Sequence, residues 1–161
     1  MLEHGLWRYI RALFGCFSPL KKSFCAVDNI QLSYNWLITD CSCYPRDPKA
    51  DEMLSTEYCW LSGEELTNLV EEDDFEWMWA VLSAFDKSVS LGEVLKYDLP
   101  YADGYRGFWE KPFTFQHPLA KMEIVQWHGC FTLVFSESEA VIGNFRRYYP
   151  QSRNLEAHID S

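Results

Sequence analysis

The residue types that most often carry catalysis occur in this sequence, but not at the spacings that catalysis requires. The four histidines lie near the termini, before a proline and in a predicted turn: His4, His117, His128 and His158. None has a nucleophile or a metal ligand at a readable spacing. The chain contains no G-x-S-x-G, no glycine-rich phosphate loop, no H-E-x-x-H and no D-x-D-x-D-G. We therefore predict no catalytic residue, and His117 is the histidine most worth testing.

The cysteines raise the question of a metal site or of disulfides. They are Cys16, Cys25, Cys41, Cys43, Cys59 and Cys130. Cys41 and Cys43 form a C-x-C pair, and Cys59 could supply a third soft ligand. Because no second C-x-x-C or Cys-His pair at zinc spacing is present, we predict no metal and no cofactor. Without an export signal, reduced thiols are the expected state.

Acidic residues are concentrated in one part of the chain. The net charge is −10, and residues 51–76 alone carry −10, without any Lys or Arg. Residues 1–22 carry +3, residues 23–50 carry −1 and residues 77–161 carry −2. A field of this sign repels phosphate and attracts a basic protein surface. We therefore expect no nucleic-acid partner and a basic protein partner, unless the acids only keep the surface solvated.

The acidic region contains the clearest helix start. Ser62 and Glu65 form an S-x-x-E capping box, and Leu61 and Leu66 are spaced as a hydrophobic staple. The helix should end near residues 72–74, where acids crowd a terminus whose dipole prefers cations. The candidate partner-binding acids lie at this end: Glu71, Glu72, Asp73 and Asp74.

The next segment, residues 75–85, is apolar on both faces whichever period is used. Aromatic and β-branched residues, and a length bounded by Asp74 and Asp86, favour a strand covered on both sides. A buried helix is the alternative. Its aromatic side chains are expected to be core rather than a ligand platform.

Residues 98–119 form a long connection without periodicity and with many aromatic residues. Long structureless connections are often functional, and protein-binding surfaces concentrate aromatic and arginine side chains. The candidate partner-binding residues here are Tyr101, Tyr105, Arg106, Phe108 and Trp109. The alternative is a loop whose aromatic side chains fold back into the core.

The remaining elements are predicted from local patterns. Residues 5–17 have apolar positions at helical spacing with two arginines, which predicts a basic amphipathic helix within a basic segment 1–22. It could dock on its own domain, on a second copy of the chain or on an anionic membrane. Residues 24–44 predict strands, with Trp36, Ile38 and Asp40 on one face and Leu37, Thr39, Cys41 and Cys43 on the other. Residues 45–55 are expected to be a surface loop.

The C-terminal third predicts two helices and a hairpin. Ser90 and Glu93 form a second S-x-x-E sequence, which starts a short helix. Residues 121–127 and 130–135 are predicted to form the two strands of a β-hairpin, with a two-residue turn at His128 and Gly129. A third S-x-x-E sequence at Ser136 starts a helix that should end before Pro150, and residues 151–161 read as a polar tail.

Together these elements predict one α+β domain over residues 1–161. The sheet is mainly antiparallel and uses residues 24–44, 76–84 and 121–136, with three or four short helices packed on it. Apolar runs are too short to cross a bilayer, and no signal-peptide pattern is present. We therefore expect a cytoplasmic protein without a membrane partner.

Several segments together resemble a family of small uncharacterised bacterial proteins. They are YNWLITDC, YCWLSGEEL, FEWMWAVLSAF and LPYADGYRGFWEKPFTFQHPLA with the hairpin that follows, and they cover most of residues 25–150. In size, acidity and aromatic loops the chain is also similar to the immunity proteins of toxin–immunity pairs. The resemblance implies an immunity-type inhibitor and no catalytic residue, and it does not extend to residues 1–22.

Three functions follow from these observations. The first is a non-catalytic protein-binding protein that presents acidic and aromatic residues to a basic partner, such as a toxin. The second is a small-molecule-binding protein or enzyme with a pocket under the 98–119 loop. The third is a structural homo-oligomer, a homodimer for example, that uses the N-terminal helix as its interface.

Overall fold

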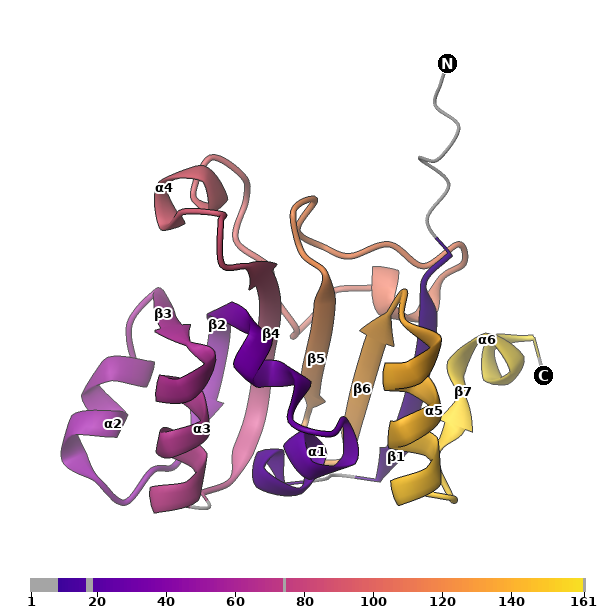
Figure 1. Ribbon diagram of the computed structural model, residues 1–161, viewed down its shortest axis with the longest axis horizontal. Coiled ribbons are helices and arrows are strands. Elements are labelled where there is room, and N and C mark those ends of the chain that lie inside the picture. Colours follow the sequence, from indigo (N-terminus) through magenta and orange to yellow (C-terminus); the bar gives the residue numbers. More distant parts are fainter. Residues whose placement is uncertain (1–8, 17–18, 74, 161) are drawn as a thin grey trace.

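The computed structural model describes residues 9–16, 19–73 and 75–160, and these form an α+β structure on one antiparallel sheet (Figure 1). The strands are β1 (Arg11–Cys16), β2 (Tyr34–Cys43), β3 (Tyr58–Ser62), β4 (Trp77–Asp86), β5 (Met122–Trp127), β6 (Phe131–Ser136) and β7 (Arg153–Asn154). Their order in the seven-stranded sheet is β3-β2-β4-β5-β6-β1-β7, and every neighbouring pair is antiparallel. The predicted fold class is confirmed.

The helices divide between the two faces of this sheet. They are α1 (Leu20–Ala26), α2 (Pro48–Leu54), α3 (Gly63–Glu72), α4 (Leu91–Val94), α5 (Glu139–Tyr148) and α6 (Leu155–Ile159), with 3₁₀ turns η2 (Ile30–Ser33) and η3 (Gly107–Trp109). Figure 1 shows α1, α3 and α5 side by side over one face. The opposite face is covered by the 98–119 loop and by α6.

Each face has its own apolar core. The helix-side core joins sheet residues to α1, α3 and α5 through residues such as Trp36, Ile38, Leu82, Leu66 and Phe145. The loop-side core joins the opposite sheet face to the loop and α6 through residues such as Leu37, Val81, Phe85, Phe108, Phe113 and Leu155. Strand β4 contributes alternate residues to both cores, so the strand covered on both sides is confirmed for residues 77–86.

Two of the three predicted capping boxes form. The Ser62 hydroxyl accepts from the Glu65 amide at 3.0 Å, and the Glu65 carboxylate accepts from the Ser62 amide at 2.8 Å. Ser90 and Glu93 form the same pair at the start of α4. At α5 the prediction is wrong by two residues, because Ser138, rather than Ser136, accepts from Val141. Ser136 is instead the last residue of β6.

The predicted N-terminal helix is wrong for residues 11–16, which form β1 between β6 and β7. Residues 5–8 and 17 lie outside the described residues. The apolar side chains whose spacing suggests a helix are instead buried on both faces of the sheet. Leu13 lies in the helix-side core and Phe14 in the loop-side core. The helix that the homo-oligomer hypothesis required is therefore not formed by these six residues.

The predicted strand over residues 24–32 is also wrong. Residues 20–26 form α1, with Leu20, Phe24 and Ala26 buried on one side, and residues 30–33 form η2. Asp28 and Asn29 both have positive φ, at 58° and 57°, which interrupts an extended chain.

A bulge in β2 changes which residues share a face. Asp40 has a φ of 49°, and the pairing with β4 shifts register after Thr39. Consequently Leu37 lies in the loop-side core, whereas Cys41 and Cys43 pack against the helix-side core. The prediction that these three residues share a face is wrong.

The Asp40 carboxylate lies toward the loop and not with Trp36 and Ile38. It accepts hydrogen bonds from the amides of Ala102 at 2.8 Å and of Asp103 at 3.1 Å. The bulge residue thus fastens the 98–119 loop to the sheet.

Three further local predictions need correction. The 45–55 loop contains α2, whose start is capped by the Asp47 carboxylate with Pro48 at the first helical position. The β5–β6 connection has three residues, because Trp127 pairs with Phe131. The expected polar tail forms β7 and α6, since Leu155 is fully buried in the loop-side core.

Candidate functional site

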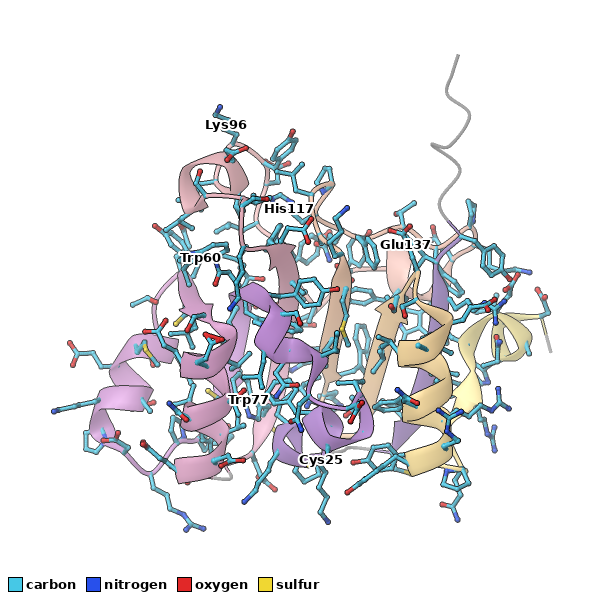
Figure 2. The ribbon with its side chains drawn as sticks, viewed as in Figure 1. Cys25, Trp60, Trp77, Lys96, His117 and Glu137 are labelled. Atoms are coloured by element: carbon cyan, nitrogen blue, oxygen red, sulfur yellow. The ribbon has the colours of Figure 1, made fainter. Side chains whose placement is uncertain are left out.

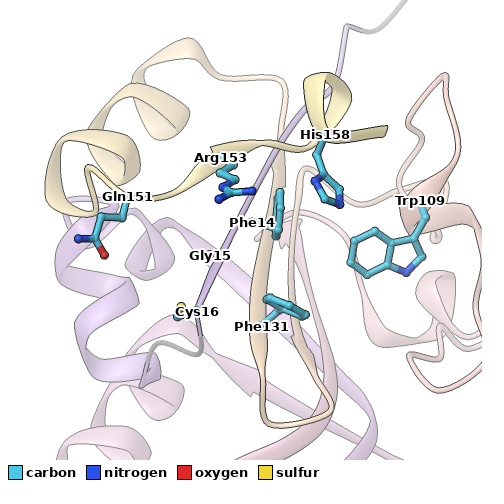
Figure 3. Close-up of a pocket in the computed structure, with 8 residues that line it drawn as sticks. All are labelled: Phe14, Gly15, Cys16, Trp109, Phe131, Gln151, Arg153 and His158. Carbon is cyan, nitrogen blue, oxygen red and sulfur yellow. The ribbon is translucent and has the colours of Figure 1, made fainter. Parts of the chain in front are cut away.

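A pocket of about 740 Å³ opens at the β1–β7 end of the sheet (Figure 3). Its lining residues come from β1, η3, β6, β7 and α6 and the chain beside them: Phe14, Gly15, Cys16, Trp109, Phe131, Gln151, Arg153 and His158. The volume lies within the range of small-molecule sites, which are concave, largely apolar and carry a few polar groups.

Four rings form the apolar part of this pocket. Phe14 is central, with ring centroids 5.8 Å from Phe131, 4.7 Å from His158 and 6.5 Å from Trp109. The Trp109 indole is supported from behind by an edge contact with Trp127 at 5.3 Å. These contacts hold the rings in place without closing the pocket.

Arg153 provides the cationic part of the pocket. It lies opposite Phe14 in the β1–β7 register, and opposite residues in a strand pair project from the same face. Figure 3 shows its guanidinium on one side of Phe14, with His158 and Trp109 on the other. Arg153 forms no ion pair with any carboxylate in residues 9–16, 19–73 and 75–160.

A smaller hollow of about 320 Å³ adjoins this pocket and shares Arg153 and His158 with it. Arg146, from the last turn of α5, also lines it. Two arginines, Arg146 and Arg153, therefore line this end of the molecule, although the chain as a whole carries a net charge of −10.

Trp109 is the one pocket residue that was a predicted site residue. The others come from segments interpreted as a helix, a hairpin strand and a frayed tail, so their convergence could not be foreseen. The sequence signal that could have predicted part of this site lies in residues 151–161. Leu155 is apolar and follows Asn154, a good helix cap whose side chain accepts from Ala157 at 3.1 Å.

The predicted acids lie elsewhere. Glu71 and Glu72 are exposed in the last turn of α3, whereas the Asp73 carboxylate accepts from the Arg46 amide at 2.6 Å. Asp74 lies outside the described residues. Because α3 packs in the helix-side core, these acids and the 98–119 loop lie on opposite faces of the sheet.

The predicted loop residues differ in exposure. Tyr101 is 48% exposed and Arg106 is exposed, whereas Tyr105 and Trp109 are half-buried. Phe108 is 2% exposed, packs 5.7 Å from Phe135 and belongs to the loop-side core. The loop therefore both fills the core, as the alternative stated, and presents a few aromatic side chains.

His117, labelled in Figure 2, is buried, and both of its ring nitrogens form hydrogen bonds. Nε2 donates to the Val94 carbonyl at 2.8 Å, and Nδ1 accepts from the Leu119 amide at 3.1 Å. The ring also packs on Phe85 and Tyr97. Burial lowers the pKa of His117, while its hydrogen bond to Val94 opposes that shift. These contacts fasten the end of the loop to α4.

The cysteines are free thiols. Within the described part of the chain, no group of three or more His, Cys, Asp or Glu side chains is arranged to hold a metal ion. No helix among the described residues has the length and apolar character that a membrane span requires.

No protein-family model, curated protein or solved structure matches this chain.

Proposed function

We propose that the protein binds a small organic anion with an aromatic or apolar body in the pocket between β1, β7 and Trp109. The observation that carries this proposal is the guanidinium of Arg153, which forms no ion pair within the described residues and lies beside a cluster of aromatic rings in a pocket of about 740 Å³. The proposal keeps the small-molecule class of function but moves the pocket. The predicted pocket lay under the 98–119 loop, whereas this one lies beside β1 and β7 and takes Trp109 from that loop.

The two parts of the ligand would use different contacts. An apolar body packs on Phe14, Phe131 and Trp109, where offset and edge-to-face ring contacts each stabilise modestly beyond their buried area. A carboxylate or sulfonate accepts from Arg153, whose planar fork suits two parallel hydrogen bonds. A hydrogen bond to a charged group contributes about 1.5–3 kcal/mol, which corresponds to roughly a tenfold to hundredfold change in affinity.

Anilinonaphthalene sulfonate is a suitable probe, because it joins an aromatic body to one anionic group. We expect its fluorescence to rise on binding, and we expect Arg153→Gln to weaken its affinity about tenfold. N-phenylnaphthylamine has the same rings without the sulfonate, so its affinity should be unchanged by Arg153→Gln. Trp109→Ala should weaken both probes.

Arg146→Gln is the matched control, because Arg146 lines the neighbouring hollow but not the pocket itself. It should leave the affinity for both probes nearly unchanged. Near-ultraviolet circular dichroism of the two arginine variants should match the wild type. For Trp109→Ala, which removes a ring packed on Trp127, far-ultraviolet circular dichroism and the urea midpoint should match instead. These controls exclude probe binding to loosened protein. Equal sulfonate affinity in the wild type and in Arg153→Gln would contradict the proposal.

A second candidate function is binding of a basic protein, such as the toxin partner of an immunity-type inhibitor. Exposed acids on α2 and α3 and beside them support it, including Asp51, Glu52, Glu71 and Glu72. Among ion pairs between described residues, Glu64 with Lys87 is the one that uses an acid of the 51–76 region. The remaining charge is left to attract a partner in solution.

The test of this second function changes two of the four predicted acids, Glu71 and Glu72. Glu71→Lys with Glu72→Lys should abolish salt-sensitive capture of a basic protein from the native host, because both side chains are exposed. Asp73 is left unchanged, since its carboxylate also holds the Arg46 amide.

Asp98→Lys with Asp103→Lys changes the net charge equally in the 98–119 loop and is the control. Equal capture by both double variants at low salt would show that the local position of the acids does not matter. It would contradict this candidate and leave the pocket proposal unaffected.

A further inference from the structure

The thiols of Cys41 and Cys43 lie against one another, with their Sγ atoms 3.0 Å apart. Residues two apart in a strand project from the same face. The bulge at Asp40 turns both of these side chains toward the helix-side core, where they remain half-buried. Two thiols at this separation are already close to the geometry of a disulfide, whose S–S bond is about 2.0 Å.

The surroundings distinguish the two thiols chemically. The two thiols share one hydrogen bond, which lowers the pKa of Cys43, partly opposed by burial. The same hydrogen bond, together with burial, raises the pKa of Cys41. Cys59, on the neighbouring strand β3, is buried, which raises its pKa to about 11. Cys43 is thus the thiol best able to act as a thiolate nucleophile.

We propose that Cys41 and Cys43 are a redox-sensitive pair that forms a reversible disulfide by exchange with a low-molecular-weight disulfide such as oxidised glutathione. The Cys43 thiolate attacks one sulfur of the reagent, which forms a mixed disulfide and releases one glutathione thiolate. Cys41, losing its proton, then attacks the Cys43 sulfur and displaces the second glutathione. The pair loses two electrons and two protons, and one oxidised glutathione becomes two reduced molecules.

Reversibility follows from the short loop that the bond closes. Only Ser42 separates the two cysteines, so a disulfide across the bulge is expected to be strained, and strained disulfides are the more readily reduced ones. Strand β2, which carries the bulge, packs against α2, as does β3. The site is remote from Arg153 and Trp109, so this inference does not depend on the pocket.

The test uses the full chain with Cys16, Cys25 and Cys130, the exposed thiols, replaced by serine. After incubation with oxidised glutathione, the intact mass should fall by two hydrogen atoms. The tryptic peptide 23–46 then contains Cys41 and Cys43 as its cysteines, so it should carry the whole loss. Reduced glutathione should restore the original mass.

Single variants test the order of the two steps. Cys41→Ser should accumulate a stable glutathione adduct at Cys43, because the displacing thiol is gone. Cys59→Ser should form the disulfide as readily as its parent. The same mapping on the unaltered chain, with exposed thiols alkylated first, gives the result if a variant fails to fold.

Three results would overturn the proposal. One is an unchanged mass at excess oxidised glutathione. Another is a bond that links Cys59 to Cys41 or Cys43. The third is a glutathione adduct that persists on Cys43 while Cys41 is present, since that would show that the pair cannot close.

Discussion

Replacing Gly63 with alanine is expected to lower the free energy of unfolding by about 3 kcal/mol. Gly63 is the first residue of α3, and η2 lies directly against it. A Cβ atom there would overlap the Gln31 carbonyl oxygen and would lie 2.8 Å from the Leu32 Cα. Both neighbours are backbone atoms, so neither can rotate away.

The position of the Gln31 carbonyl is fixed by other contacts. It accepts from the indole nitrogen of Trp36 at 3.0 Å, and Trp36 is fully buried. The Gln31 side chain donates to Thr67 at 3.1 Å, on the next turn of α3. Relief of the clash would therefore separate η2 from α3 and disturb the packing of Trp36.

Gly92→Ala is the matched control, because Gly92 also lies in the first turn after an S-x-x-E cap. The nearest neighbour of a Cβ there is the Ser90 hydroxyl at 3.8 Å, an ordinary contact. Alanine should stabilise this helix by about 0.5–1 kcal/mol, because glycine costs more backbone entropy. Urea unfolding of both variants measures the two effects, and a loss of under about 0.5 kcal/mol for Gly63→Ala would contradict the prediction.

The sequence predicts best those helices and strands whose start or burial is determined by residues close to one another in the chain. The Ser62–Glu65 and Ser90–Glu93 boxes place two helix starts correctly, because each satisfies its own backbone donors. Strand β4 is recognisable because residues 80–85 are apolar apart from Ser83, and all six are buried.

Other features depend on contacts that are distant in sequence. The pattern of residues 5–17 fits a helix, but Leu13 and Phe14 serve two cores only because β6 and β7 flank β1. Glycine is needed at position 63 because the backbone of Gln31 and Leu32 lies against it. The residue at the β2 bulge, Asp40, accepts hydrogen bonds from the distant 98–119 loop. The periodicity of apolar residues within one segment cannot predict constraints that come from distant segments.

The candidate site shows the same division. Composition and length identified the 98–119 loop as unusual, and Trp109 does line the pocket. The remaining lining residues required the topology, which places β7 and α6 beside β1. The sheet also separates the acids of α3 from that loop, so one combined acidic and aromatic surface does not form.

Glu123 leads to the second large effect, a stability that falls as pH rises. Glu123 lies on β5 and is fully buried, and this burial raises the pKa of its carboxyl from 4.5 to about 7. The Gln116 amide donates a hydrogen bond to the carboxyl at 3.0 Å, which opposes the rise. Among the residues that the structure describes, the second oxygen of this carboxyl has no hydrogen-bond partner. The same holds for the hydroxyl of Ser83, which lies opposite in the β4–β5 register.

The sign of the effect follows from proton binding. Between pH 4.5 and about 7 the folded state holds a proton that the unfolded state has lost, so stability is present at low pH and declines through this window. Each pKa unit corresponds to about 1.4 kcal/mol, so the full decline is about 3 kcal/mol. Glu123→Gln keeps an acceptor for Gln116 but has no charge to bury.

We therefore expect Glu123→Gln to gain about 3 kcal/mol relative to the wild type between pH 4.5 and pH 8, measured by urea unfolding. Groups other than Glu123 titrate alike in both proteins, so their contributions cancel when the two free energies of unfolding are subtracted at each pH. Glu52→Gln, at an exposed position, should show no such gain and is the control. A constant difference across this range would mean that Glu123 ionises at its ordinary pKa despite its burial.

The same carboxyl connects pH to the loop that carries Trp109. The Gln116 amide donates to Glu123, and the Gln116 side chain exchanges two hydrogen bonds with the Tyr101 backbone, at 2.8 and 3.0 Å. Ionisation of Glu123 places an uncompensated charge beneath these contacts, at the point where the loop meets β5. If the stability loss is transmitted there, amide hydrogen exchange at Tyr101 and Gln116 should accelerate, beyond the intrinsic effect of pH, in the wild type but not in Glu123→Gln.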